Sequence, residues 1–69
     1  MKIQLNGDHK EFADGLTVGR LLEQLRVHPE LVVVELNLTI LKRAQLPETV
    51  LQEGDQVEIV HFVGGGAGR

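Results

Sequence analysis

The sequence predicts an α+β domain in which one main helix packs across a mixed sheet of four to five strands. Apolar and polar residues alternate near both ends of the chain, which is the period of a β-strand. Around residue 20, apolar residues recur instead at the spacing of one helical face. Because a single helix laid across a sheet buries the apolar side of both, the expected element order is β-β-α-β-β-β.

Residues 1–5 form the first expected strand, with Ile3 and Leu5 facing the core. Asn6-Gly7 follows directly, and this dipeptide favours the positive φ angles of a tight hairpin turn. Residues 9–13 would then return alongside the first strand. Few of them are apolar, so we expect them to form an edge of the sheet.

The helix is expected over residues 18–27. Thr17 stands at the N-cap position, where its hydroxyl accepts a hydrogen bond from a free backbone N–H. Pro29 disfavours helical geometry in the residue before it, so the helix should stop near Val27. Gly19 is expected to let the helix pack closely on the sheet. The apolar face consists of Val18, Leu21, Leu22 and Leu25.

The second half of the chain should supply the remaining strands. Residues 31–36 are apolar and β-branched, the pattern of a central strand. Pro47 excludes a central strand from the irregular stretch at 45–51. The other expected elements are a turn at 37–39, a short strand at 40–42, a turn at 53–55 and a final strand at 56–63.

Size and charge narrow the classes of function. The chain has 69 residues, which predicts one small domain, and a net charge of −3. Nucleic-acid-binding domains usually carry a basic patch, and Lys42-Arg43 is the only adjacent basic pair, so no nucleic-acid partner is expected. No apolar run approaches the ~20 residues that span a bilayer, so no membrane partner is expected either. Without a visible secretion signal, the expected location is cytoplasmic.

The sequence offers little for catalysis of its own. It contains no cysteine, which excludes disulfides and thiolate chemistry. His9, His28 and His61 are scattered without the clustering that a metal site requires. No Ser-His-Asp arrangement or phosphate-binding loop can be recognised. We therefore expect no metal, no cofactor bound by this chain and no independent enzymatic activity.

The last expected strand leads into a glycine-rich ending. Four of the eight glycines lie within residues 64–69. Glycine has no Cβ, so such a segment is slender and flexible. We expect residues 1–63 to form the domain, and residues 64–69 to form a flexible tail that can enter a narrow site on another protein.

This ending, together with most of the chain, resembles the ThiS family of ubiquitin-like sulfur carriers. The likeness includes the hairpin around Asn6-Gly7, the helix at 18–27 and the strand at 32–37. Its most specific part is the stretch at 53–66, Glu-Gly-Asp-Gln-Val-Glu-Ile-Val-His-Phe-Val-Gly-Gly-Gly. A pair of glycines alone would be a weak signal, whereas this composite ending is a strong one.

The resemblance implies a β-grasp fold and a role as a protein co-substrate. In such a family, an adenylyltransferase of the ThiF or ubiquitin-activating type uses ATP to adenylate the C-terminal glycine. Sulfur then displaces AMP and leaves a thiocarboxylate. A thiazole synthase takes that sulfur to build the thiazole ring of thiamine.

Carried onto this chain, the resemblance implies that the reactive carboxylate belongs to Gly66, with Gly64 and Gly65 lying in the partner's channel. The family usually ends at that glycine, whereas this chain continues with Ala67-Gly68-Arg69. A peptidase that removes these three residues is therefore an expected partner. Activation of Arg69 itself, or loss of the family's function in this copy, are the alternatives.

The last strand should also carry recognition. If alternation places Val57 and Ile59 in the core, the residues between and after them point outward. Exposed apolar side chains beside the tail would form a docking patch for a partner. The alternative is that Phe62 folds back onto a core that is short of aromatic residues. The expected docking residues are Val33, Glu58, Val60 and Phe62.

Two other functions stay open at this point. A carrier of this kind could serve molybdopterin synthesis, cysteine synthesis or tRNA thiolation, although the short chain and the His-Phe-Val-Gly-Gly-Gly ending favour thiamine. The chain could also be a β-grasp binding module without any chemistry at its tail.

Overall fold

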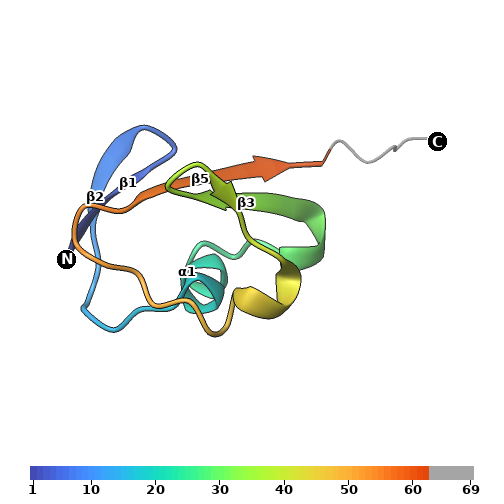
Figure 1. Ribbon diagram of the computed structural model, residues 1–69, viewed down its shortest axis with the longest axis horizontal. Helices are drawn as coiled ribbons and strands as arrows, with labels where there is room; N and C mark the ends of the chain where they lie inside the picture. The colour runs from blue at the N-terminus through green and yellow to red at the C-terminus, as the bar shows by residue number, and fades with distance from the viewer. Residues whose placement is uncertain (63–69) are drawn as a thin grey trace.

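Five strands form one mixed sheet, and a single α-helix packs across one of its faces (Figure 1). The computed structural model describes residues 1–62. The elements are β1 (Lys2–Leu5), β2 (Asp8–Glu11), α1 (Val18–Gln24), β3 (Val32–Leu36), β4 (Thr39–Ile40) and β5 (Gln56–His61), with two short 3₁₀ helices, η1 (Pro29–Leu31) and η2 (Arg43–Gln45). The predicted element order β-β-α-β-β-β is confirmed.

The strands lie in the order β2-β1-β5-β3-β4. The β1–β5 pair is parallel, and the other three pairs are antiparallel. The predicted central strand, β3, has neighbours on both sides, but the middle of the sheet belongs to β5. The last strand of the described chain is therefore held between the two hairpins (Figure 1).

The N-terminal hairpin forms as its turn dipeptide predicts. Asn6 and Gly7 have φ angles of 48° and 87°, the positive values that a two-residue hairpin turn needs. All four residues of β2 are exposed, and the strand lies at the edge of the sheet. Because β2 buries no side chain, its polar sequence is compatible with the fold.

Helix α1 begins as predicted and ends earlier than predicted. The Thr17 hydroxyl accepts a hydrogen bond from the backbone N–H of Arg20 at 3.1 Å. The helix stops at Gln24 because Arg26 adopts a left-handed φ of 58°. The N–H groups of Arg26 and Val27 then bond back to the carbonyls of Glu23 and Leu22, the pattern of a Schellman motif. The predicted end near Val27 is therefore wrong.

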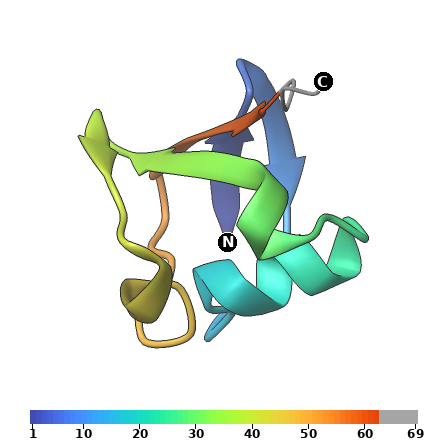
Figure 2. The ribbon, with the colours of Figure 1, turned by 90° about the vertical axis from the view of Figure 1, so that its right-hand side faces the viewer.

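The core lies between α1 and the inner face of the sheet (Figure 2). Val18, Leu21 and Leu22 of the helix are fully buried, whereas Leu25, at the C-cap, is 38% exposed. Leu25 therefore does not belong to the buried face that its spacing predicts. Across residues 1–62 no polar or charged side chain is buried. The remaining core residues are Ile3, Leu5, Leu16, Val32, Val34, Leu46, Leu51, Val57 and Ile59.

Gly19 makes a close approach, but to a loop and not to the sheet as predicted. Its N–H donates to the carbonyl of Leu46 at 2.8 Å. A Cβ at this position would lie 3.3 Å from Cα of Pro47 and 3.4 Å from the carbonyl oxygen of Leu46. These are backbone atoms, which cannot move aside as a flexible side chain does, so the position favours glycine.

Substituting Gly19→Val should therefore destabilise the domain, although valine is the better helix former. We expect the free energy of unfolding to fall by about 1–3 kcal/mol, the usual cost of forcing extra atoms into a packed site. Glu23→Val, at an exposed position of the same helix, controls for β-branching and should change stability far less. Urea unfolding of the two variants measures the difference. Equal stability of both variants would contradict the close approach.

Candidate functional site

Strand β5 alternates between the core and the solvent. Val57 and Ile59 are buried, with 0% and 9% of their surface exposed, which confirms the predicted orientation. Glu58 is exposed, and Val60 and Phe62 have exposed fractions of 55% and 54%. The face of the sheet that points away from α1 therefore carries large apolar side chains in open solvent.

Neighbouring strands extend this surface. Val33 of β3 pairs directly with Val60, so the two side chains share the outer face. Ile40 of β4 is opposite Glu35, which places it on the same face, and it is 61% exposed. Phe62 lines a shallow hollow together with Val33 and Ile40. We name Val33, Ile40, Val60 and Phe62 the outer patch; Ile40 was not foreseen, because the pairing of β4 is not evident in the sequence.

A pair of acidic side chains borders the outer patch. Glu35 and Glu58 face each other across β3 and β5. Like charges at directly opposed positions repel and destabilise a sheet slightly. Within residues 1–62, the single ion pair joins the N-terminal amine to Asp14, so neither glutamate is neutralised by a neighbour. A partner with a basic surface would relieve this repulsion.

Two asparagines hold β5 in place, a role that the sequence did not reveal. Asn37 has a φ of 51°, and its Oδ1 accepts from the N–H of Gln56 at 2.9 Å. Its Nδ2 donates to Asp55 Oδ1 at 3.0 Å. Asn6 accepts from the N–H of Ile59 at 2.7 Å. Each turn of a hairpin thus contributes a side chain that completes the backbone hydrogen bonding of β5.

The predicted reactive end lies outside the described residues. Residues 63–69, which the structure does not describe, include Gly64, Gly65 and Gly66. They also include Val63, the last residue of the predicted domain, and the segment Ala67-Gly68-Arg69. The described chain ends at Phe62, directly after β5. All four predicted docking residues lie close to one another in the sheet. Val33 is in β3, Glu58 and Val60 are in the paired strand β5, and Phe62 directly follows β5.

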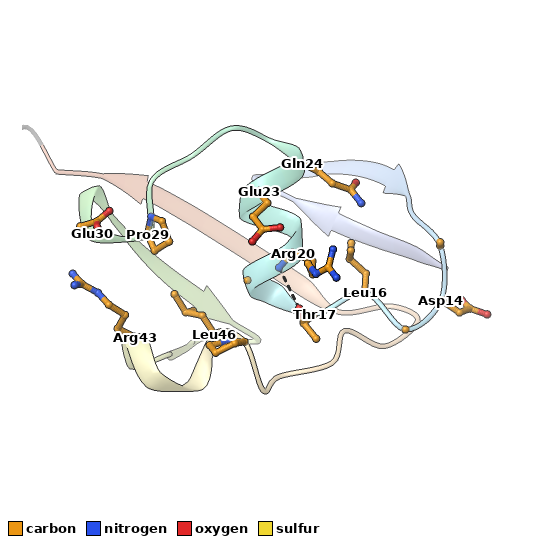
Figure 3. A pocket seen from close by; sticks show the side chains of 14 residues that line it. Asp14, Leu16, Thr17, Arg20, Glu23, Gln24, Pro29, Glu30, Arg43 and Leu46 are labelled. Atoms are coloured by element: carbon orange, nitrogen blue, oxygen red, sulfur yellow. Dashed lines mark hydrogen bonds between the residues drawn. The ribbon is translucent and has the colours of Figure 1, made fainter.

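A separate groove of about 860 Å³ lies on the helix side of the molecule. Its walls come from α1 and from the segment around Leu46 and Pro47 (Figure 3). Arg43 lies at one side of the groove and Arg20 lies beside α1, so their guanidinium groups do not converge on one point (Figure 3). The groove therefore lacks the convergent polar groups of a small-molecule site.

Metal ligands do not gather in the part of the chain that the structure describes: no three His, Asp or Glu side chains come together there. No described helix is long and apolar enough to cross a membrane.

A five-stranded mixed sheet with β1 and β5 parallel at its centre, crossed by one helix, defines a β-grasp protein of the ubiquitin-like class. Comparison with known proteins identifies the family within this class. The model of the ThiS family matches residues 3–66. The chain belongs to the ThiS family.

Individual relatives agree with this assignment. The sulfur carrier protein ThiS of Bacillus subtilis is 42% identical over 65 residues, which cover 93% of this chain and 98% of that protein. The crystal structure of a thiamine biosynthesis protein, ThiS, from Geobacter metallireducens superposes with a TM-score of 0.83 at 39% identity, covering 96% of this chain and all of the other.

Longer proteins also contain a similar stretch. A thiazole synthase of Magnetococcus marinus is 47% identical over 66 residues, which cover 96% of this chain and 20% of that protein. A thiazole synthase of Paramagnetospirillum magneticum is 39% identical over 67 residues. The chain spans about a fifth of the length of these two relatives.

Proposed function

We propose that this protein is a sulfur carrier for the thiazole ring of thiamine, with the carboxyl group of Gly66 as its reactive end. The observation that carries the proposal is the extent of the family match, which runs from residue 3 through Gly66 and stops there. Strand β5, whose Val60 is exposed, leads toward that segment of sequence.

The chemistry proceeds on an activating partner, an adenylyltransferase of the ThiF or ubiquitin-activating type. The Gly66 carboxylate attacks the α-phosphate of ATP and forms an acyl-adenylate with release of pyrophosphate. A nucleophile whose sulfur is at the oxidation level of sulfide then attacks the acyl carbon. AMP leaves with the C–O bonding pair, and a thiocarboxylate remains. ATP binds to the partner, and this chain acts as co-substrate and not as enzyme.

Glycine suits the approach to this reaction. The acyl carbon must be reached first by ATP and then by the sulfur nucleophile, and a neighbouring side chain would crowd both. Residues 64–66, if extended, reach about 10 Å, so the body of the domain remains outside the partner's channel. Gly64 and Gly65 would lie within that channel.

Recognition by the partner would use the outer patch and the adjacent acids. Val60 and Phe62 are exposed close to the tail in sequence, and Val33 adjoins Val60. A few side chains near the centre of an interface, aromatic ones often among them, commonly carry much of the binding energy. Glu58 and Glu35 would meet basic groups, which speeds the encounter of the two proteins.

The relatives favour the thiamine pathway over molybdopterin synthesis, cysteine synthesis and tRNA thiolation. The Bacillus relative is named a sulfur carrier protein, ThiS, and the Geobacter relative is named a thiamine biosynthesis protein, ThiS. Two proteins named thiazole synthase contain a stretch similar to nearly the whole of this chain. A thiazole synthase is therefore the proposed acceptor of the sulfur, and the ATP-dependent steps favour a cytoplasmic location.

Because Ala67-Gly68-Arg69 follow the proposed reactive glycine, we infer that a peptidase removes these residues. Until then, Gly66 has an amide in place of a carboxylate and cannot form an acyl-adenylate. Removal of three residues would thus act as the first step of maturation.

Intact-mass spectrometry of the protein purified from its own host tests the proposal. We expect a chain that ends at Gly66, part of it heavier by the exchange of one oxygen for sulfur. A full-length chain that is never modified, even with the adenylyltransferase, ATP and sulfide present, would contradict the proposal. A binding module without tail chemistry would instead keep its function after deletion of all residues beyond Val63.

A further inference from the structure

The second half of β5 has one paired edge and one open edge. Phe62 donates its N–H to the carbonyl of Leu31, and the N–H of Asn37 donates to the carbonyl of Gln56. In an antiparallel pair, hydrogen-bonded positions alternate, so Val60 and Glu58 also direct their backbone groups toward β3. The backbone groups of Val57, Ile59 and His61 must then point to the opposite edge.

Strand β1 covers that opposite edge only in part. The carbonyl of Val57 accepts from the N–H of Asn6 at 2.8 Å. The chain then turns at Asn6, and the Asn6 side-chain oxygen accepts a hydrogen bond from the N–H of Ile59. Beyond this point, no group among residues 1–62 pairs with the carbonyl of Ile59 or with the N–H and carbonyl of His61. Figure 1 shows β5 continuing past the β1–β2 hairpin.

The open edge lacks the usual protection against strand pairing. Exposed edges are commonly guarded by charged residues, proline or a bulge. The segment from Ile59 to Phe62 contains no proline and no Lys, Arg, Asp or Glu. Its exposed apolar side chains, Val60 and Phe62, favour extended backbone. As far as residues 1–62 are concerned, the edge therefore presents a free donor and two free acceptors in the geometry that an added strand requires.

We propose that the adenylyltransferase adds an extended strand to this edge, along Ile59 and His61. This inference rests on the proposed function, because it assumes that Gly66 enters the partner's active site. Three residues lie between Phe62 and Gly66, so the four steps of chain span at most about 14 Å, and a partner that encloses the reactive carboxylate must lie against the end of β5. The open edge is the backbone surface nearest in sequence to that carboxylate.

Strand pairing would also solve a problem of register. Adenylation requires one carboxylate at the α-phosphate, and a featureless run of glycines provides no side chain to fix the position of the chain. Pairing at His61 sets the backbone in a defined register, since a slip of one residue exchanges the two faces of the strand. The length of chain from there to Gly66 then determines which residue reaches ATP.

Amide hydrogen exchange on the wild-type chain, alone and with the host's adenylyltransferase, tests the pairing. In the free protein the amides of Val60 and Phe62 should exchange slowly and that of His61 quickly. In the complex the exchange of the His61 amide should slow by at least tenfold. A His61 amide that still exchanges quickly while the complex is formed would overturn the inference. If no complex or adenylate forms at all, the proposed function fails instead.

Two variants at His61 separate the contribution of the backbone N–H to binding from that of the side chain. His61→Pro removes the N–H that faces the open edge and leaves the bonds to β3 in place, which is where a strand tolerates proline. We expect about tenfold weaker binding to the adenylyltransferase, roughly 1.4 kcal/mol. His61→Ala keeps the N–H and should bind like the wild type. Equal weakening in both variants would assign the effect to the imidazole and contradict strand addition.

A second copy of this chain is the competing occupant of the edge. Sedimentation at increasing protein concentration distinguishes the two. We expect a monomer without the adenylyltransferase. A dimer that dissociates on the His61→Pro substitution would show that the edge serves self-association, which would overturn the inference.

Discussion

Replacing Gly65→Val should lower the rate of adenylation by about a hundredfold and leave the melting temperature unchanged. The added branched side chain would stand beside the reacting carbonyl, in a channel that we propose is lined for glycine. Misplacement of a reacting group by even 1 Å costs on the order of a hundredfold in rate. Stability should not change, because the position follows the last core residue of β5, Ile59. Pyrophosphate exchange with the adenylyltransferase and thermal unfolding measure the two effects.

Gly68→Val provides the matched control. It makes the same change three residues later, in the segment that we propose is removed, so protein matured in its host should be adenylated normally. Two results would argue against the proposed role of the tail. One is normal adenylation of the Gly65→Val protein, and the other is a large loss of its stability.

Val60→Asp should weaken binding to the adenylyltransferase by about 2 kcal/mol, the loss that marks a hot-spot residue of an interface. The substitution removes an apolar side chain from the outer patch. It also places a third carboxylate on the outer face, which already holds Glu35 and Glu58. Because Val60 is 55% exposed and its pairing with Val33 is through the backbone, the fold should persist. Titration calorimetry measures the change in Kd.

Val50→Asp is a suitable comparison for this variant. Val50 is 46% exposed and lies on the isolated bridge to Thr17, not on β5 or its neighbours β1 and β3. The same change of charge and loss of apolar surface there should leave Kd nearly unaltered. Similar weakening by both substitutions would show that net charge, and not the outer patch, governs the interaction.

Local patterns predicted most of the elements correctly. The alternation in residues 1–5 and 56–61, the Asn6-Gly7 turn and the Thr17 cap each depend on neighbours within a few residues, and each is present in the structure. The outward direction of Val60 follows from the same alternation. Features of this kind are readable because the chemistry that determines them is local.

The incorrect predictions concern features that depend on distant contacts or on uncommon residues. The helix ends at a left-handed Arg26, where glycine is the usual signal, so the sequence carried no warning. Gly19 contacts the backbone at Leu46 and Pro47, which no local pattern connects to the helix. The placement of β5 at the centre of the sheet is likewise a property of topology.

The candidate site was only partly predictable for the same reason. Alternation predicts Glu58, Val60 and Phe62, all close in sequence to the tail. Ile40 joins them only because β4 pairs with β3. The hydrogen bond from Ile59 to Asn6 joins residues that are 53 positions apart, so the open edge beyond it could not be foreseen. The proposed chemistry of Gly66 is supported by the family match over residues 3–66, and the variants above test it.

The central position of β5 has a consequence for synthesis on the ribosome. Within the sheet, the hairpins β1–β2 and β3–β4 are joined only by β5, which is the last of the described strands to be translated. An isolated two-stranded hairpin is marginally stable in water, so a nascent chain should remain without a lasting tertiary structure until Gln56–His61 has left the exit tunnel. Folding would then be completed only shortly before the proposed removal of Ala67-Gly68-Arg69.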